Sequence, residues 1–187
     1  MPTKVALITG AGLGLGRAYA ECLAKRGARV VVNNRQHGEV EAGERSADRV
    51  VTSIRERGGE AVADYNDVSQ DGAGGRMVEH ALAEYGRLDA VICNAGVAHT
   101  GMFHTLSLGS IRETINTNVL GTLELIHAAL PVMRKAGHGR IVVTTSSSAL
   151  GDVGYAAYAA SKTAMHGLVR CLALENASKG VRINALM

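Results

Sequence analysis

The sequence predicts an α/β protein with a doubly wound parallel sheet between two layers of helices, a three-layer α/β/α architecture. Short runs rich in Val, Ile and Ala alternate with longer segments of helical periodicity along the chain. The apolar runs lack a regular alternation with polar residues, which is typical of strands that are covered on both faces. Repeated strand–helix units of this kind wind into one parallel sheet.

The expected elements follow this alternation from the N-terminus onward. The strands are predicted at Val5–Thr9, Ala28–Asn33, Glu60–Asp64, Ala90–Asn94, Arg140–Thr145 and Val181–Asn184. The helices are predicted at Gly14–Arg26, Ser46–Arg57, Gly75–Tyr85, Ser110–Lys135 and Ala157–Lys179. Glycines suited to a left-handed C-terminal cap follow these helices: Gly27, Gly58, Gly86, Gly137 and Gly180. No repeat, low-complexity tract or linker interrupts the pattern, so residues 1–187 are expected to form a single domain.

The composition is that of a globular protein and argues against several classes of function. Of the 187 residues, 47% are hydrophobic and 20% are charged, so a substantial core is expected and disorder is not. A net charge of +3 and an aromatic content of 3% argue against a nucleic-acid partner. No apolar run is long enough to span a membrane, and the first residues lack the order of a secretory signal.

The cysteines and histidines indicate neither disulfides nor a metal site. Cys22, Cys93 and Cys171 are odd in number and share no metal-like spacing. No pair of histidines has the H-E-x-x-H spacing of a zinc motif. We therefore expect reduced thiols, a cytoplasmic location and no bound metal.

Four glycines stand in the eight residues Thr9–Gly16, directly after the first predicted strand. Glycine costs a strand or helix about 0.5–1 kcal/mol relative to alanine, so the cluster indicates a backbone geometry that side chains would block. The spacing is T-G-x-x-x-G-x-G and not the usual G-x-G-x-x-G. At the junction of a strand and a helix, such a loop lets a pyrophosphate approach the backbone, although an ordinary tight turn is the alternative. The candidate dinucleotide contacts in this loop are Gly10, Gly12, Leu13, Gly14, Leu15 and Gly16.

Three further motifs fall at consistent places on this scaffold. Asn94–Gly96 ends the fourth predicted strand and borders the same crevice as the glycine loop. Asn118 lies inside a predicted long helix, where asparagine is a poor helix former without a tertiary role. Tyr158 and Lys162 are four residues apart, so the phenol and the ammonium share one helix face. Each motif is weak alone, but their order and spacing together are highly specific.

Over essentially its whole length, the sequence resembles the classical short-chain dehydrogenase/reductase family, whose fold is Rossmann-like. An extended member of the family would have glycine where Leu13 stands. The motifs that match the classical pattern are Thr9-Gly10-x-x-x-Gly14-x-Gly16, Asp67-Val68, Asn94-Ala95-Gly96, Asn118, a serine run and Tyr158-x-x-x-Lys162. The resemblance implies that Asp67 and Val68 contact the adenine and that Asn94, Ala95 and Gly96 contact the dinucleotide. For Asp67 the alternative is a turn residue at a strand end.

The resemblance also implies the reaction, which is hydride transfer between a nicotinamide and a carbonyl or secondary alcohol. Tyr158 would be the general acid/base, and Lys162 would lower the pKa of the phenol from its usual value near 10 and hold the nicotinamide ribose. Asn118 would anchor a water that relays protons to the lysine. Members of the family usually have the serine that polarises the carbonyl six residues after a basic residue and about twelve before the tyrosine. Ser146 lies six residues after Arg140 and twelve before Tyr158, so the resemblance implies this role for Ser146. Ser148 is the alternative.

The end of the second predicted strand bears on the choice of cofactor. NAD-preferring enzymes usually have Asp or Glu there, whereas this chain has Asn33 and Asn34, followed by Arg35. A guanidinium favours a 2′-phosphate, so NADP is the expected cofactor, bound through Asn34 and Arg35, with NAD as the alternative. Leu13 argues the other way, because many NADP enzymes have a basic residue at that loop position. Arg35 as a solvated surface residue is the alternative.

The substrate, the extent of the domain and its association are less well defined by the sequence. The stretches Val30–Asn34 and Ser46–Val68 are similar to the hydroxyacyl-CoA dehydrogenase module of multifunctional enzymes, but they serve the cofactor half. The substrate is expected to be a small-molecule carbonyl or alcohol. Classical members run further than Met187, so a seventh strand and a substrate lid are expected to be missing, and a truncated or non-catalytic dinucleotide-binding protein is the alternative function. The resemblance implies a homodimer or homotetramer formed through Ser110–Lys135 and Ala157–Lys179.

Overall fold

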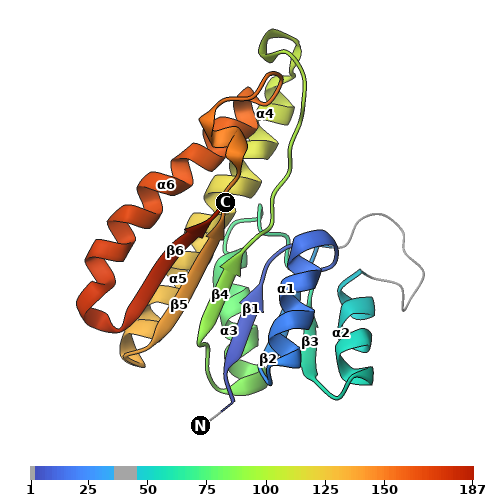
Figure 1. Cartoon of the computed structure of the whole chain (residues 1–187), viewed down its shortest axis with the longest axis vertical. Helices are drawn as coiled ribbons and strands as arrows, with labels where there is room; N and C mark the ends of the chain where they lie inside the picture. The colour runs from blue at the N-terminus through green and yellow to red at the C-terminus, as the bar shows by residue number, and fades with distance from the viewer. Residues whose placement is uncertain (1–2, 36–45) are drawn as a thin grey trace.

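The computed structural model describes residues 3–35 and 46–187, which share one six-stranded sheet (Figure 1). All neighbouring strands are parallel, and their order is β3-β2-β1-β4-β5-β6. The strands are β1 (Val5–Ile8), β2 (Arg29–Asn33), β3 (Glu60–Asp64), β4 (Ala90–Cys93), β5 (Gly139–Thr144) and β6 (Val181–Leu186). The order reverses between β1 and β4, and a ligand crevice opens at the carboxyl end of a parallel sheet at such a point. The predicted doubly wound α/β fold is confirmed.

Helices cover both faces of the sheet. They are α1 (Gly14–Lys25), α2 (Ser46–Glu56), α3 (Ala73–Tyr85), α4 (Leu108–Ile115), α5 (Gly121–Lys135) and α6 (Ala156–Asn176). Buried residues of α1 and α2 form one core with one face of the sheet, and those of α3, α5 and α6 form a second core with the other face. No helix within the described ranges has both the length and the apolar character that crossing a membrane requires.

The central strands are buried because side chains alternate between these two cores. Leu7 packs in the core with α3 and α5, whereas the next residue, Ile8, packs in the core with α1 and α2. In β2, Val31 faces the first of these cores, and Val30 and Val32 face the second. All four residues of β1 are buried, which explains why the sequence shows a continuous apolar run instead of an alternating one.

The helix predicted over residues 110–135 is interrupted in the structure. It consists of α4, a π-helical turn over Asn116–Leu120, and α5. In the π turn the amide of Gly121 donates to the carbonyl of Asn116, five residues earlier. Such turns are rare and occur frequently at functional sites. The other helix and strand boundaries lie within three residues of the prediction, and all five predicted cap glycines have a positive φ.

Candidate active site

The loop after β1 contributes Gly10 to the lining of a crevice at the carboxyl end of the sheet. Gly10 has a φ of +62°, and a Cβ atom there would lie 2.9 Å from the Cα of Ala95. A Cβ atom on Gly16 would lie 2.3 Å from the carbonyl oxygen of Gly10. Glycine is therefore required at both positions, because the loop packs directly against the start of α1 and against the segment after β4.

The other two glycines of the loop have different roles. A Cβ atom on Gly12 would lie 2.4 Å from the Oγ of Ser46, so this glycine lets the loop approach the start of α2. Gly14 has a φ of +54° and open space around it, and it begins α1. The side chains of Leu13 and Leu15 are 66% and 61% exposed at the crest of the loop. The first amides of α1 lack partners within the helix and favour an anion at this end.

Asn94 holds the glycine loop in place through its own hydrogen bonds. Its amide nitrogen donates to the Oγ1 of Thr9 at 3.0 Å, and its Nδ2 donates to the carbonyls of Thr9 at 3.1 Å and Gly10 at 3.3 Å. The amide of Ala95 also donates to the Thr9 hydroxyl, at 3.1 Å. The side chain of Asn94 is thus committed to the loop, whereas Ala95 and Gly96 line the crevice. No role for the Thr9 hydroxyl was expected from the sequence, but it joins the end of β1 to the segment after β4.

The ends of β2 and β3 form the far end of the crevice. The side chain of Asn33 is buried and donates to Asp64 at 2.6 Å and to the carbonyl of Asn66 at 2.8 Å. Asn34 lines the crevice and donates to the Oγ of Ser46 at 2.7 Å. Both asparagines thus line the crevice, but the side chain of Asn33 is buried and bonded between the ends of β2 and β3. Arg35 also lines this end.

Asp67 and Val68 line the same end of the crevice and are held by a tight turn. The Oδ1 of Asp67 accepts hydrogen bonds from the amide of Ser69 at 2.9 Å and from its hydroxyl at 2.7 Å. Burial opposes ionisation of Asp67, but these hydrogen bonds and Arg35 outweigh it and hold its pKa below the usual value. Asp67 is therefore a fixed carboxylate, both a turn residue and part of the crevice.

Tyr158 and Lys162 lie near the start of α6, on one side of the helix as predicted. Lys162 is only 4% exposed, and its Nζ donates to the carbonyl of Thr144, at the end of β5, at 2.8 Å. The same Nζ lies 5.5 Å from the centre of the Tyr158 ring. Burial lowers the pKa of Lys162, and Cys93 opposes this change. The pair thus places a buried cationic group beside a half-buried phenol.

Asn118 links the segment after β4 to α6. Its Oδ1 accepts from the amide of Val97 at 2.8 Å, and its Nδ2 donates to the carbonyl of Val97 and to the Oγ of Ser161, both at 2.9 Å. Ser161 in turn donates to the carbonyl of Tyr158 at 2.6 Å. A Cβ atom on Gly96 would lie 3.2 Å from Asn118 and 3.6 Å from the Nζ of Lys162, so these groups surround the same point. A tertiary role for Asn118 was expected from its place inside a helix, but these partners were not.

The serine run lies between β5 and α6. Ser146 has an extended backbone, and its Oγ accepts a hydrogen bond from the amide of Ser148 at 3.2 Å, at the start of a 3-10 helix over Ser147–Leu150. This helix is tied to α6 by Thr163, whose hydroxyl donates to the carbonyl of Ala149 at 3.1 Å. The preference for Ser146 over Ser148 remains a prediction.

Comparison with known proteins finds relatives that match nearly the whole length of the chain. A family model described as short chain dehydrogenase matches residues 4–187. The chain is 40% identical over 186 residues to a putative short-chain type dehydrogenase/reductase of Mycobacterium tuberculosis, covering 98% of this chain and 65% of that protein. It is also 40% identical to the peroxisomal multifunctional enzyme type 2 of Drosophila melanogaster, covering 98% of this chain and 31% of that protein.

A solved structure agrees with these sequence matches. The crystal structure of a short chain dehydrogenase from Mycobacterium avium matches with a TM-score of 0.92 and 35% identity, covering 97% of this chain and 66% of that chain. The chain therefore belongs to the short-chain dehydrogenase/reductase family of oxidoreductases. It spans 65% of the length of the mycobacterial relative and 31% of the length of the Drosophila enzyme.

Proposed function

We propose that this chain is an oxidoreductase that transfers a hydride between a nicotinamide cofactor and a carbonyl or secondary alcohol, with Tyr158 as the general acid/base. The observation that supports this most is the Tyr158–Lys162 pair, in which a buried ammonium lies 5.5 Å from the centre of the phenol ring. Gly96 connects this pair to the crevice, because it lines the crevice and also lies next to Lys162.

Two independent observations support our proposal that the crevice binds a dinucleotide. A Cβ atom would clash at Gly10, Gly12 and Gly16, so the loop has the bare backbone that a pyrophosphate can approach. Thr117, which lines the crevice, has a buried hydroxyl without a hydrogen-bond partner among the described residues. We propose that Gly10, Gly12, Leu13, Gly14, Leu15 and Gly16 hold the pyrophosphate, that Asn34, Arg35, Asp67 and Val68 hold the adenosine, and that Ala95, Gly96, Tyr158 and Lys162 hold the nicotinamide half, with Asn94 bracing the loop.

The proposed roles of the side chains follow from their charges and partners. A bound nicotinamide supplies the hydride donor or acceptor. Tyr158 moves the proton at its phenol oxygen, and the positive charge of Lys162 beside the ring stabilises negative charge that develops there during the transfer. Ser146 donates a hydrogen bond to the substrate oxygen, and Asn118 keeps the segment after Gly96 and the start of α6 in register. We also propose that Asn118 anchors a water that relays protons to Lys162.

The choice between cofactors is proposed to favour NADP(H), because Arg35 lies at the adenosine end and Asn34 there carries no charge. We expect Arg35→Ala to weaken NADP(H) binding about tenfold or more and to change NAD(H) binding less than twofold, since a charge-assisted hydrogen bond contributes roughly 1.5–3 kcal/mol. Fluorescence titration with both cofactors measures this. Equal affinity of the unmodified protein for both cofactors would contradict the proposed preference.

The substrate is proposed to be a small carbonyl compound or the corresponding alcohol. One relative, which is 33% identical over 187 residues and of which this chain covers 73%, is named 3-oxoacyl-[acyl-carrier-protein] reductase of Synechocystis. Turnover should therefore be assayed on a panel of ketones and secondary alcohols that includes 3-oxoacyl and 3-hydroxyacyl thioesters. Consumption of reduced nicotinamide with a ketone, or its formation from oxidised nicotinamide with an alcohol, supports the proposal. Cofactor binding without turnover of any member would favour the non-catalytic alternative.

We propose a dimer or tetramer that forms through α5 and α6. Exposed residues recur every three or four positions along α6 and form a stripe on one side of the helix. Leu174, at the end of this stripe, is 81% exposed. Leu120 in the π turn and Leu123 in α5 are 49% and 38% exposed. Pairing these faces about a two-fold axis would remove apolar surface from water. Light scattering coupled to size exclusion is expected to give a dimer or tetramer, and a monomer at micromolar concentration would contradict the pairing. The α6 stripe consists of Ala160, Ala164, Gly167, Cys171 and Leu174.

We also propose a cytoplasmic location. All three cysteines are free thiols. Thiols of this kind persist in the reducing cytosol.

A further inference from the structure

Four charged or polar side chains form a series of ion pairs at the adenosine end of the crevice. One of them, Glu113, comes from α4, a helix that contains none of the family motifs. The Nη1 of Arg35 lies 3.3 Å from Asp67, and its Nη2 lies 3.5 Å from the Oε1 of Glu113 on α4. The other oxygen of Glu113, Oε2, lies 2.8 Å from the Nε2 of His99. The guanidinium is thus shared between two carboxylates that come from opposite sides of the sheet's switch point.

We propose that Glu113 determines how strongly this site distinguishes NADP(H) from NAD(H), because its carboxylate competes with a 2′-phosphate for Arg35. The inference rests on the proposed function, in which the crevice holds a nicotinamide dinucleotide. It adds a residue from α4 to the residues at the end of β2 and in the glycine loop that bear on this selectivity in the sequence.

The two carboxylates differ in how easily a phosphate could replace them. Asp67 is fixed by the amide and the hydroxyl of Ser69, and it is part of the crevice wall. Glu113 is held only through its side chain, which is 43% exposed, by Arg35 and His99. A phosphate oxygen can therefore take the place of Glu113 at Nη2 while Asp67 keeps Nη1.

Glu113 is charged when this exchange takes place. The hydrogen bond with His99 and, to a lesser degree, the charge of Arg35 hold the pKa of Glu113 below its usual value. A 2′-phosphate must then break an ion pair and also approach a second negative charge. The 2′-hydroxyl of NAD(H) is neutral, so it does neither. Glu113 consequently weakens NADP(H) binding and leaves NAD(H) binding nearly unchanged.

The test is Glu113→Gln, which keeps the shape of the side chain and an oxygen for His99 but removes the charge. Exposed ion pairs change equilibria by up to about fivefold, and relief of repulsion from the phosphate adds to this. We therefore expect Glu113→Gln to tighten NADP(H) binding about three- to tenfold and to change NAD(H) binding less than twofold. Both dissociation constants are measured by calorimetric titration, without reference to turnover.

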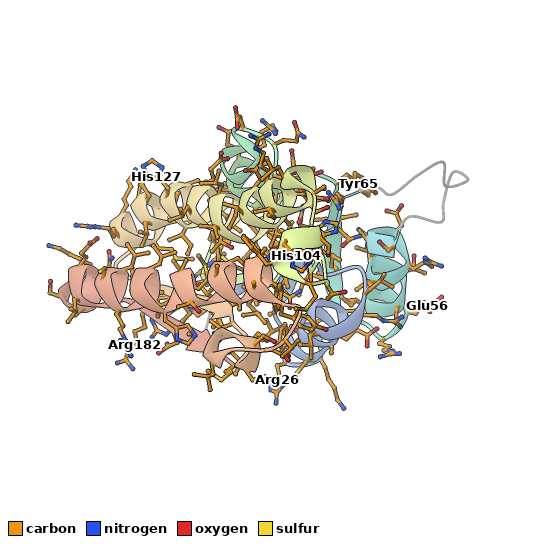
Figure 2. All side chains as sticks on the ribbon, turned by 90° about the horizontal axis from the view of Figure 1, so that it is seen from above. Arg26, Glu56, Tyr65, His104, His127 and Arg182 are labelled. Carbon is orange, nitrogen blue, oxygen red and sulfur yellow. The ribbon has the colours of Figure 1, made fainter. Side chains whose placement is uncertain are left out.

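Two further variants control this experiment. Glu56→Gln removes the same charge from the last residue of α2. This helix ends just before β3 begins, so Glu56 lies near the amino end of the parallel strands, and the crevice lies at their carboxyl end. Figure 2 shows Glu56 projecting outward from this helix, and its change is expected to leave both cofactors unaffected. In the double variant Arg35→Ala, Glu113→Gln, the gain for NADP(H) is expected to disappear, because Glu113 acts through Arg35.

Each contrary outcome has a distinct meaning. If Glu113→Gln changes the NADP(H) to NAD(H) affinity ratio less than twofold while Arg35→Ala still weakens NADP(H), the inference about Glu113 is wrong and the proposed function stands. The inference is also wrong if the gain persists in the double variant, since it then bypasses Arg35. If the unmodified protein binds neither dinucleotide, the proposed function fails and the inference fails with it.

Discussion

Tyr158→Phe is expected to lower kcat by about 10²–10⁴-fold, the usual contribution of a general acid/base, which corresponds to roughly 2.7–5.4 kcal/mol. The change removes only the phenol oxygen, at which the proton is proposed to move. The Nζ of Lys162 keeps its hydrogen bond to the carbonyl of Thr144, so the nicotinamide half of the crevice keeps its shape. Cofactor dissociation constants should therefore stay within about threefold of the unmodified protein, whereas the loss of kcat corresponds to at least 2.7 kcal/mol.

The matched control for this variant is Tyr155→Phe. The two rings are neighbours, with centroids 6.0 Å apart in an edge-on arrangement, and both side chains are half-buried. Tyr155 has no proposed part in proton transfer, so turnover should be retained within a few-fold. Full turnover of Tyr158→Phe would contradict the general acid/base assignment. Equal losses in both variants would show that turnover depends on the surroundings of this pair of rings and not on a proton at Tyr158.

Gly16→Ala is expected to weaken dinucleotide binding by more than tenfold, or about 1.4 kcal/mol. The added Cβ would lie 2.3 Å from the carbonyl oxygen of Gly10 and 2.6 Å from the Nδ2 of Asn94. Backbone and a fully bonded amide cannot both remain in place, so the loop must shift away from α1. Overpacking of this kind also lowers the free energy of unfolding by about 1–3 kcal/mol. Cofactor titration and a urea unfolding curve measure the two effects.

Gly75→Ala on α3 is the control for a glycine-to-alanine change in a helix. A Cβ atom there meets nothing within 4 Å, and the residue has no positive φ. Its stability should be unchanged or raised by up to about 1 kcal/mol, because alanine favours the helix. Cofactor binding should be unaffected. If Gly16→Ala binds dinucleotides as tightly as Gly75→Ala, the glycine loop is not the pyrophosphate site.

The sequence predicts the sheet and its helices well because strands that are buried on both faces consist almost entirely of apolar residues. In β1 and β2, consecutive residues enter two different cores, so both faces must be apolar and the run is unbroken. The glycine loop was also predictable, since Gly10 and Gly16 allow approaches that no other residue permits. These signals are local, and a single sequence contains them.

Other parts of the site depend on contacts between segments that are far apart in the sequence. The π turn at Asn118 accompanies bonds to Val97, 21 residues away, and to Ser161, 43 residues away, so helical periodicity gives no sign of it. The bonds from the Asn94 side chain to the glycine loop join residues 85 and 84 positions apart, so the sequence contains no sign of them, and the contact of Asn94 with the cofactor stays a prediction. Glu113 lies on a helix without a motif and reaches Arg35 only because α4 packs beside the crevice.

The central claim is that this chain moves a hydride between a nicotinamide and a carbonyl carbon at Tyr158. It is tested most directly with reduced dinucleotide that carries deuterium at the reactive nicotinamide carbon, incubated with the ketone panel and analysed by mass spectrometry. The account predicts that the product alcohol carries deuterium on its carbinol carbon with the unmodified protein and with Tyr155→Phe, and that Tyr158→Phe gives at least 10²-fold less of it. Tight binding of the labelled cofactor without deuterium in any product would contradict the account and favour a dinucleotide-binding protein without turnover.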